Sequence, residues 1–350
     1  LEDCLWDGEV VSLLSQIHEY KGRQDLFVLQ WPSSVARLME IAKVQSVESS
    51  NRIEGIVTTK ARIRSLLADK TTPRNRDEEE IMGYRDVLNT VHENYEYIDL
   101  TRHIVLQLHR DLYAYSHKGI GGQFKNVQNS IIERLADGSE VERFKPLAPY
   151  ETPAAIDEIC QGVNAVLQDK SVDPLLVIPV FIHDFLCIHP FNDGNGRMSR
   201  LLTTLLLYQN GYMIGKFISL EQKIERTKDS YYAALAQSGA GWHTGDEDVV
   251  PFVKYILRVI LAAYRDFESR IALLNTSLSA KDRIKIIISA TIGKITKSGI
   301  LEKQPDIAVS TVEKALKELV EEGFIERHGV GRSTFYVKVS QKISFHAKYI

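Results

Sequence analysis

The sequence predicts a mainly α-helical protein with one small β-hairpin in its middle and a separate C-terminal domain. Three observations support this fold class. Apolar residues recur at helical spacing over most of the chain before residue 275. The segment 119–149 breaks that rhythm with glycines and short strand-like runs. After residue 280, two helical segments precede two strand-like runs that are separated by glycines.

Several segments show the apolar spacing of an α-helix with one buried face: 7–17, 33–50, 76–97, 101–113, 154–168, 175–188 and 249–274. The charged run 74–80 places its acids in the first turn of a helix, where the helix dipole favours them, and predicts a solvated face. A chain of 350 residues is expected to form two or three compact units. We divide it into residues 1–100, 101–275 and 280–350.

The break in the helical rhythm contains a hairpin signal. The strand-like runs 130–135 and 140–145 flank Ala136-Asp137-Gly138-Ser139, and Asp-Gly between two short runs is typical of a hairpin turn. Gly119-Ile-Gly-Gly122 is also glycine-rich, but it does not open a helix, which argues against a P-loop. The sequence therefore predicts a small surface hairpin in this segment.

Composition and charge argue against several classes of protein. The net charge of −3 gives no overall attraction to nucleic acid or to a membrane surface, and no stretch approaches 18 apolar residues without a charge. The cysteines Cys4, Cys160 and Cys187 lie far apart without CxxC spacing, which indicates neither a disulfide framework nor a zinc site. With an ordinary hydrophobic fraction of 44%, the chain is expected to be a cytoplasmic, multi-domain protein.

The most informative stretch is His189-Pro-Phe-Asn-Asp-Gly-Asn-Gly-Arg-Met-Ser-Arg200. The apolar run 201–208 follows at once and predicts a buried helix. Gly194 and Gly196 therefore lie at a loop-to-helix junction, where free N–H groups and the positive end of the helix dipole favour an anion. Because they have no Cβ, these glycines also let the backbone approach a phosphate closely.

The ionisable residues of this stretch suit the same chemistry. A neutral histidine such as His189 can accept a hydroxyl proton near neutral pH. Asp193 is a hard oxygen ligand, suited to Mg²⁺ that carries substrate phosphates. Arg197 and Arg200 lie three apart on one helix face, and their forked donors suit phosphate oxygens. Together these residues can move a phosphate-bearing group from a nucleotide onto a hydroxyl.

This stretch resembles the signature of the Fic family, H-x-F-x-D/E-G-N-G-R-x-x-R, and matches it at every fixed position. Most Fic proteins transfer AMP from ATP to a side-chain hydroxyl of a protein. The resemblance implies a Fic-type helical core, ATP as co-substrate and Mg²⁺ as cofactor. It also implies that His189 deprotonates the target hydroxyl, that Phe191 anchors the loop beside the ATP site, and that Asp193 holds the metal.

The resemblance assigns the remaining residues of the stretch to the phosphates of ATP. Gly194, Asn195 and Gly196 would bind the α- and β-phosphates. Arg197 would contact the phosphates, and Arg200 the γ-phosphate. Both glycines are present, which favours AMP transfer over the kinase-like variant of the family.

A second motif, Ser49-Ser50-Asn-Arg-Ile-Glu54-Gly55, lies far upstream. By itself it predicts a helix that ends at Gly55, with Ser50 and Glu54 on one face. Next to the Fic signature it is similar to the inhibitory motif S/T-x-x-x-E-G/N of that family. The resemblance implies that Glu54 pairs with Arg200, takes the place of the γ-phosphate and keeps the enzyme inhibited.

Two further pairs of residues are candidates for the nucleotide pocket. In the resemblance the hairpin is the family's flap, which pairs with the target segment by main-chain hydrogen bonds. Ile131 and Ile132 would be flap residues near ATP. Tyr231 and Tyr232 lie on a helix where Fic domains often carry a tyrosine pair beside the nucleotide, although aromatic residues at helical spacing are also typical of a core.

The C-terminal segment resembles a winged helix-turn-helix domain. Helices are expected over 281–292 and 310–323, the second with a serine N-cap and a glycine C-cap, followed by strands over 324–327 and 333–339. Residues 281–340 hold 11 Lys plus Arg and 8 Asp plus Glu, a net +3, which is mild for a DNA binder. DNA binding and docking to a protein, including dimerisation, both stay open.

The leading hypothesis is a protein adenylyltransferase that is inhibited by Glu54 and acts on a Ser, Thr or Tyr hydroxyl of a protein, the chain itself included. One alternative is a winged-helix regulator or adaptor with a nucleotide-sensing Fic core. Another is removal of AMP from a modified protein at the same site. The family resemblance also allows a homodimer through helical surfaces, whereas no membrane partner is expected.

Overall fold

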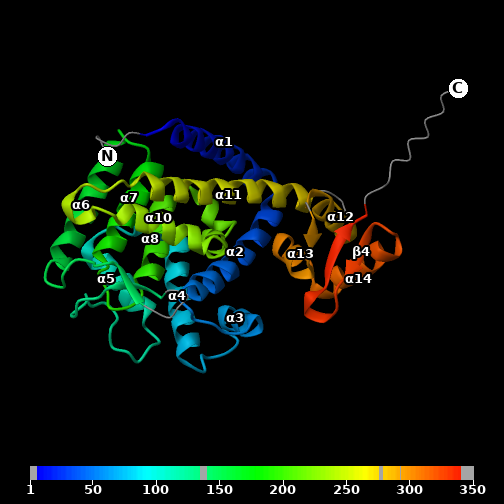
Figure 1. Cartoon of the computed structure of the whole chain (residues 1–350), viewed down its shortest axis with the longest axis horizontal. Coiled ribbons are helices and arrows are strands. Elements are labelled where there is room, and N and C mark those ends of the chain that lie inside the picture. Colours follow the sequence, from blue (N-terminus) through cyan, green and yellow to red (C-terminus); the bar gives the residue numbers. More distant parts are fainter. Residues whose placement is uncertain (1–5, 135–139, 276–278, 292, 340–350) are drawn as a thin grey trace. The chain divides into compact units, whose positions relative to one another are not determined.

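A computed structural model describes residues 6–134, 140–275, 279–291 and 293–339 and confirms a mainly helical fold. The chain divides into two compact units (Figure 1). The first comprises Leu1–Gln30 and Leu38–Phe267, and the second comprises Trp31–Arg37 and Glu268–Ile350. Among the described helices, none has both the length and the apolar character needed to cross a membrane.

Helices make up almost all of the first unit. In chain order they are α1 Gly8–Gln30, α2 Pro32–Ile53, α3 Lys60–Leu67, α4 Arg76–Asn94, α5 Arg102–Leu112, α6 Thr152–Asp169, α7 Pro174–Ile188, α8 Asn195–Gln209, α9 Leu220–Arg226, α10 Lys228–Gly239 and α11 Val250–Asn275. The first residues of α2, 32–37, and the last residues of α11, 268–275, belong to the second unit.

Helices α7 and α8 form the centre of this unit. They pack against each other, while α6 packs on α7 and α4 packs on α8. Nearly every side chain of α7 is buried, and on α8 Leu201 and Leu205 are fully buried. Apolar side chains all around a helix require other elements on every side, which explains the central place of both helices. The loop that joins them is therefore held between two fixed helix ends.

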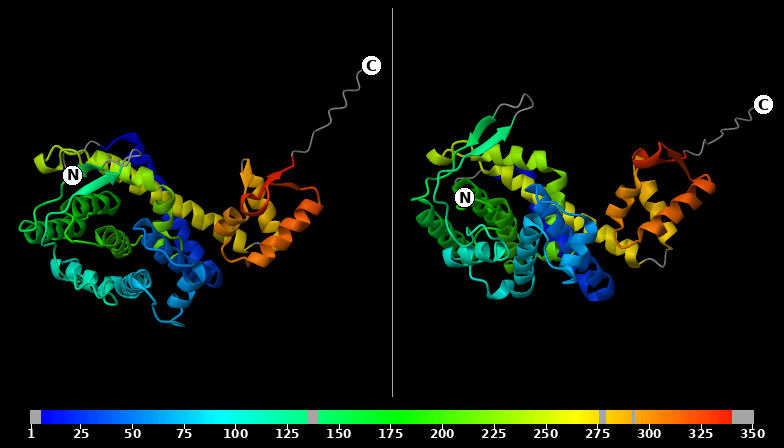
Figure 2. Two further views of the ribbon diagram at one scale, coloured as in Figure 1. Left: turned by 60° about the horizontal axis from the view of Figure 1, so that its bottom comes forward. Right: turned by 90° about the horizontal axis from the view of Figure 1, so that it is seen from below.

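The predicted hairpin is present as strands β1 Ile131–Arg134 and β2 Glu140–Phe144, which pair antiparallel with Ile132 opposite Glu142 (Figure 2). The Asp137-Gly138 turn lies outside the described residues. Strand β2 packs against α10, so the base of the hairpin is attached to the helical body of the unit.

Helix α1 extends much further than the apolar spacing predicts. That spacing ends near Ile17, whereas the helix continues to Gln30. Its second half holds charged pairs at i and i+4, Glu19 with Arg23 and Lys21 with Asp25, at 3.4 and 3.8 Å. Such pairs stabilise a helix without apolar periodicity, so the pattern alone cannot locate the helix end.

The second unit contains helices α12 Ala280–Ala290, α13 Lys297–Lys303 and α14 Val309–Glu321, and strands β3 Lys294–Ile295, β4 Ile325–His328 and β5 Phe335–Lys338 in the order β3-β5-β4. Its core is aliphatic and includes Ile284, Ile300 and Leu316. Helix α14 begins after Ala308, so the predicted serine N-cap is wrong and Ser310 lies inside the helix. The winged-helix assignment stays a prediction.

Candidate active site

His189 ends helix α7 in a conformation that is uncommon for a residue with a side chain. Its φ is 52°, in the left-handed region, while its N–H still donates to the Phe185 carbonyl. Its Nδ1 lies 3.3 Å from the Leu186 carbonyl. Because a carbonyl only accepts, Nδ1 is the protonated nitrogen and Nε2 keeps a free lone pair. Burial lowers the pKa of His189 to about 4, so the ring is neutral at pH 7 and Nε2 can accept a proton.

Each loop glycine leaves room for a specific neighbour. Gly194 has φ 89° and begins α8, and a Cβ there would lie 3.0 Å from the Tyr113 hydroxyl. At Gly196 a Cβ would lie 2.2 Å from Oε1 of Glu54. The first N–H groups of α8 have no partner within the helix. The carboxylate of Glu54 lies beside Gly196 in this first turn, and the binding of a phosphate there stays a prediction.

Asn195 and Phe191 fix the shape of the loop from inside. The Asn195 side chain accepts from the Phe191 N–H at 2.9 Å and donates to the Phe191 carbonyl at 2.7 Å. Phe191 is fully buried and stacks on His109 with ring centroids 3.6 Å apart. Phe191 thus lies where the predicted loop anchor should be. The Asn195 amide is engaged by the loop, which leaves the main-chain N–H of Asn195 as its possible contact to a phosphate.

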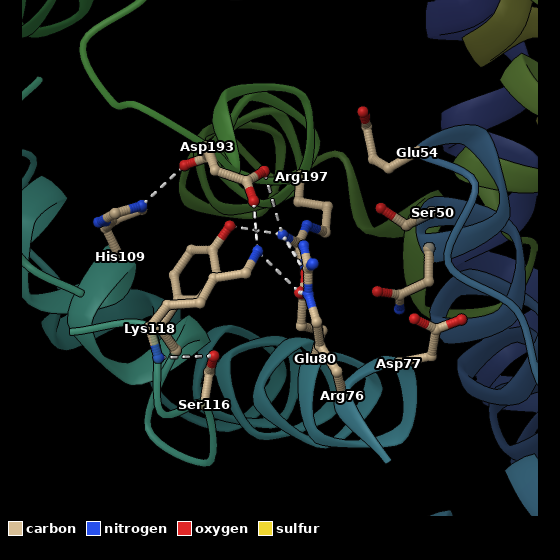
Figure 3. Close-up of polar contacts among 12 residues, drawn as sticks. Ser50, Glu54, Arg76, Asp77, Glu80, His109, Ser116, Lys118, Asp193 and Arg197 are labelled. Carbon is tan, nitrogen blue, oxygen red and sulfur yellow. Dashed lines mark hydrogen bonds and ion pairs between the residues drawn. The ribbon is translucent and has the colours of Figure 1, made fainter. Parts of the chain in front are cut away.

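Arg197 is fully buried and holds a cluster of polar groups (Figure 3). Its Nη2 lies 2.8 Å from Glu80 and donates to the Tyr113 hydroxyl at 2.6 Å. The Asp193 carboxylate lies 3.7 Å from the same nitrogen. A buried charge requires such partners because the loss of its hydration is costly.

Lys118 links the two carboxylates of this cluster. Its Nζ lies 2.6 Å from Asp193 Oδ2 and 2.9 Å from Glu80 Oε1. Burial alone would raise the pKa of Glu80, but Arg197, Arg76 and Lys118 outweigh it and hold this pKa below its ordinary value. The pKa of Asp193 is likewise lowered, because Lys118 and Arg197 outweigh the effect of its burial.

The sequence did not reveal Glu80, Lys118, Tyr113 or His109 as part of the site. The run 74–80 was expected to be a solvated face, whereas Glu78 and Glu80 are 3% and 1% exposed. That prediction is wrong for these two carboxylates, which lie on different sides of α4. Glu80 is buried where α4 packs on α8, and Glu78 is buried beside Arg62 of α3.

Arg200 is bound by the end of α2. Its Nε donates to Ser50 Oγ at 2.8 Å, and its Nη2 donates to the Ser50 carbonyl at 3.0 Å and to Glu54 Oε1 at 2.8 Å. Arg200 is 4% exposed, whereas the Glu54 side chain is 32% exposed. Two residues predicted from separate motifs, 146 positions apart in sequence, are therefore in direct contact.

The chain turn after α2 places Glu54 at this site. The N–H of Gly55 donates to the Arg52 carbonyl and the N–H of Ile56 donates to the Asn51 carbonyl, at 3.0 Å each. This bond pattern closes a helix end with glycine in the left-handed region, and Gly55 has φ 79°. Glu54 lies in this turn, directly after α2 ends at Ile53, and its side chain reaches Arg200.

The two candidate tyrosines lie in different surroundings. Tyr231 is 4% exposed and packs on Phe252 and Tyr255, at centroid distances of 6.0 and 5.6 Å. Tyr232 is 43% exposed, with Lys228 at 5.7 Å from its ring. Burial raises the pKa of Tyr232, and Glu54 lies near enough to add to this shift. Tyr232 therefore has an exposed side chain near Glu54, whereas Tyr231 is buried, and a role of either beside the nucleotide stays a prediction.

The flap candidates are only partly described. Ile131 is partly buried at the start of β1, and the backbone of Ile132 pairs within the hairpin, while the side chain of Ile132 lies outside the described residues. Asn129, just before β1, donates to the Phe191 carbonyl at 3.2 Å. The flap is thus joined to the His189 loop by a direct hydrogen bond.

The surroundings of Asp193 fit a magnesium ion bound largely through substrate phosphates. Among the residues that the structure describes, no group of three or more His, Cys, Asp or Glu side chains forms a protein cage for a metal. The Asp193 side chain is 44% exposed, whereas Glu80 is buried and engaged by three cations. One accessible carboxylate is the donor set expected for Mg²⁺ that keeps several waters and phosphate oxygens.

The comparisons with known proteins all find similarity to Fic proteins. Residues 99–207 match the Fic/DOC family. The chain is 26% identical over 301 residues to the protein adenylyltransferase Fic of Drosophila melanogaster, covering 83% of this chain and 54% of the relative. It is 24% identical over 256 residues to the protein adenylyltransferase fic-1 of Caenorhabditis elegans, covering 71% and 45%. The chain spans about half the length of these relatives.

Solved structures show the same fold. A Fic family protein from Desulfovibrio desulfuricans G20 superimposes with a TM-score of 0.63 at 20% identity, covering 96% of this chain and 98% of that one. A fragment of Fic-1 from C. elegans superimposes with a TM-score of 0.57 at 22% identity, covering 76% of this chain and 73% of that one.

Proposed function

This chain contains a Fic/DOC domain, and from this premise we propose that it is a protein adenylyltransferase that transfers AMP from ATP to a hydroxyl of a protein. One observation carries the proposal. His189 has a neutral ring at the end of α7 with Nδ1 toward the Leu186 carbonyl, which leaves Nε2 to accept a proton, and the N-terminus of α8 lies across the same short loop.

The residues suggest the following course. Nε2 of His189 accepts the proton of the target hydroxyl while the hydroxyl oxygen bonds to the α-phosphorus of ATP. The bond from that phosphorus to the β-phosphate oxygen breaks, and pyrophosphate leaves. The N–H groups at the start of α8 stabilise the charge that develops on the phosphates. Bound Mg²⁺, held by Asp193, would neutralise charge on the leaving pyrophosphate.

We also propose that Glu54 inhibits this reaction. Its carboxylate contacts Arg200 and lies beside Gly196. It therefore fills the position that a terminal phosphate would need and binds the arginine that would bind that phosphate. Two negative groups cannot share one arginine without repulsion. ATP could then bind only in a pose in which the α-phosphate does not face His189.

The test is transfer of label from ATP labelled at the α-phosphate, with Mg²⁺, onto the chain itself and onto a cell lysate. We expect weak labelling of the wild type, strong labelling by Glu54→Ala and none by Glu54→Ala/His189→Ala. Glu40→Ala, which removes an exposed carboxylate from the same helix, should match the wild type. No labelling by any variant that still binds ATP would contradict the proposal, and release of AMP from a pre-labelled protein would assign the site to AMP removal.

A second function, DNA binding through the second unit, is favoured by one observation. The acids on and just after α14 are mostly paired within the unit: Glu318 and Glu322 with Lys281 of α12, and Glu313 with Lys297 of α13. These carboxylates therefore oppose phosphates less than the sequence suggests. Lys314 is exposed, and the Lys317 side chain is 79% exposed, with a long contact of 3.9 Å to Glu321 of the same helix.

Fluorescence anisotropy with a labelled DNA duplex at two salt concentrations tests this second function. Each of Lys314→Gln and Lys317→Gln should weaken binding and reduce the salt slope by about one. Lys285→Gln is the control, because Lys285 is paired with Glu322 at 3.0 Å. Absence of salt-sensitive binding by the wild type would leave docking to a protein as the role of this unit.

A further inference from the structure

Lys125 lies at the base of the flap and holds the main chain on both sides of His189. It is 3% exposed. Its own N–H donates to the Pro190 carbonyl at 2.8 Å, and its Nζ donates to the Ile188 carbonyl at 2.8 Å. The two residues that flank His189 in the chain are therefore bound by one lysine from far upstream in the sequence.

Asn129 completes this arrangement. Its Oδ1 lies 3.2 Å from Lys125 Nζ, and its Nδ2 donates to the Phe191 carbonyl at 3.2 Å. Three carbonyls of the loop, those of Ile188, Pro190 and Phe191, thus accept from Lys125 and Asn129. We call these two residues the carbonyl clamp.

The conformation of His189 explains why a clamp is needed. A residue other than glycine in the left-handed region is disfavoured by about 1–2 kcal/mol, so the surroundings must hold it there. Burial of the Lys125 ammonium is itself unfavourable and lowers its pKa to about 8. The acceptors described for Nζ are uncharged oxygens. An apolar residue at this position would stabilise a packed core more than a lysine does. We therefore expect the buried lysine to have a role other than packing.

We propose that Lys125, assisted by Asn129, is a positioning residue that fixes the backbone of His189 and thereby aims Nε2 at the target hydroxyl. The proposal rests on the proposed adenylyltransferase function for its rate prediction, but its geometric part does not. It also couples the flap to catalysis, because the segment that carries the clamp continues directly into β1. A target strand that pairs with the flap would therefore act on the same residues that position His189.

The charge of Lys125 supplies a readout that a purely structural role would not change. Two charged groups act on His189: Lys125 lowers its pKa and Glu54 raises it, in addition to the larger effect of burial and the contact with the Leu186 carbonyl. Lys125→Met removes the positive charge at similar volume, so the pKa of His189 should be higher than in the same background with Lys125. Lys125→Arg keeps the charge and should keep the pKa low.

The experiment uses the full chain with Glu54→Ala as background, so that a transfer rate can be measured. Lys125→Met, Lys125→Arg and Asn129→Ala are compared with Lys145→Met, which removes an exposed lysine at the other end of the flap. For each protein the measurements are kcat and KM for ATP, the ATP dissociation constant by calorimetry, and the NMR titration of ¹³C-labelled His189.

We expect Lys125→Met to lower kcat by about 100-fold, the loss typical of a misplaced catalytic group, with ATP affinity within about twofold of the background. Asn129→Ala should lower kcat by about tenfold, and Lys125→Arg should recover part of the rate. Lys145→Met should match the background. If Lys125→Met does not fold, Asn129→Ala and Lys125→Arg still test the clamp through kcat and the titration.

Two outcomes would overturn the proposal. One is a loss of rate that is matched by an equal loss of ATP affinity, with the titration of His189 unchanged. The other is a normal rate in the folded clamp variants. If the Glu54→Ala background transfers no AMP at all, the proposed function fails, yet the titration of His189 still decides whether Lys125 acts on that histidine.

Discussion

Arg197 and Arg200 lie almost one turn apart on α8, yet the partners that neutralise them differ in kind. Arg197 is fully buried and contacts Glu80, which is 1% exposed and lies within a core helix. Arg200 is 4% exposed and contacts Glu54, which is 32% exposed and lies just after the last turn of α2. One pair belongs to the packed interior, and the other joins the interior to a partly exposed carboxylate at the end of α2.

This difference separates an ion pair that maintains the structure of the site from an ion pair that we propose controls it. If Glu54 departs, Arg200 keeps its bonds to Ser50, and water or a phosphate can reach it. If Glu80 were lost, no solvent could replace it beside Arg197. In the described part of the chain, Nε and Nη1 of Arg197 already lack hydrogen-bond partners. We infer that the Glu80 pair maintains the phosphate site, whereas the Glu54 pair regulates access to it.

The largest expected effect comes from Glu80→Ala. It leaves Arg197 as an uncompensated buried charge and removes a partner of Lys118, so the free energy of unfolding should fall by about 3–5 kcal/mol. Glu54→Ala should change it by less than about 1 kcal/mol, because its carboxylate is partly exposed. Urea unfolding of both variants measures the contrast. Equal losses would show that the two pairs do not differ as proposed.

An intermediate effect is expected from Ser50→Ala. The Ser50 hydroxyl accepts from Arg200 Nε, and hydrogen bonds to charged groups contribute about 1.5–3 kcal/mol. We expect a stability loss at the lower end of that range and a rise in basal AMP transfer smaller than that of Glu54→Ala, because the Ser50 carbonyl still holds Arg200. Label transfer and urea unfolding report the two effects.

Ser65→Ala is the control for that variant, since the Ser65 hydroxyl donates to the Ala61 carbonyl of its own helix α3 in an exposed hydrogen bond. It should alter neither quantity. Basal transfer in Ser50→Ala that equals that of Glu54→Ala would mean that the hydroxyl, rather than the ion pair, keeps α2 on the site.

What the sequence could predict follows from where the residues lie along the chain. His189, Asp193 and Arg200 are contiguous, so their pattern is visible, and Glu54 lies in a short motif with a glycine that marks a helix end. The partners of Arg197 are dispersed. Glu80 is a single charged residue in α4, and Tyr113 is a single aromatic residue just after α5. Each resembles an ordinary charged or aromatic position in the sequence, and tertiary packing, such as that of α4 on α8, brings them to Arg197.

The fold was predictable to a similar extent and for similar reasons. The apolar face of α5 is evident from its spacing and α7 from its nearly continuous apolar run, whereas the second half of α1 depends on charged pairs that give no periodic signal. The clamp on His189 could not be predicted, because three of its bonds end on main-chain carbonyls whose positions depend on tertiary packing.

The smallest expected effect comes from Gly55→Ala. A Cβ at this position meets no atom within 4 Å, so the only penalty is the left-handed backbone at φ 79°, about 1 kcal/mol. The penalty weakens the turn that places Glu54, and basal AMP transfer should rise by a factor of about two to five, since 1.4 kcal/mol corresponds to tenfold.

Gly22→Ala is a matched control with the opposite sign. Gly22 lies exposed inside α1 at an ordinary helical φ, so alanine there should stabilise the protein by up to about 1 kcal/mol and leave transfer unchanged. A transfer rate in Gly55→Ala that equals that of Gly22→Ala would mean that Glu54 is held by Arg200 alone, and that the turn after α2 does not contribute to inhibition.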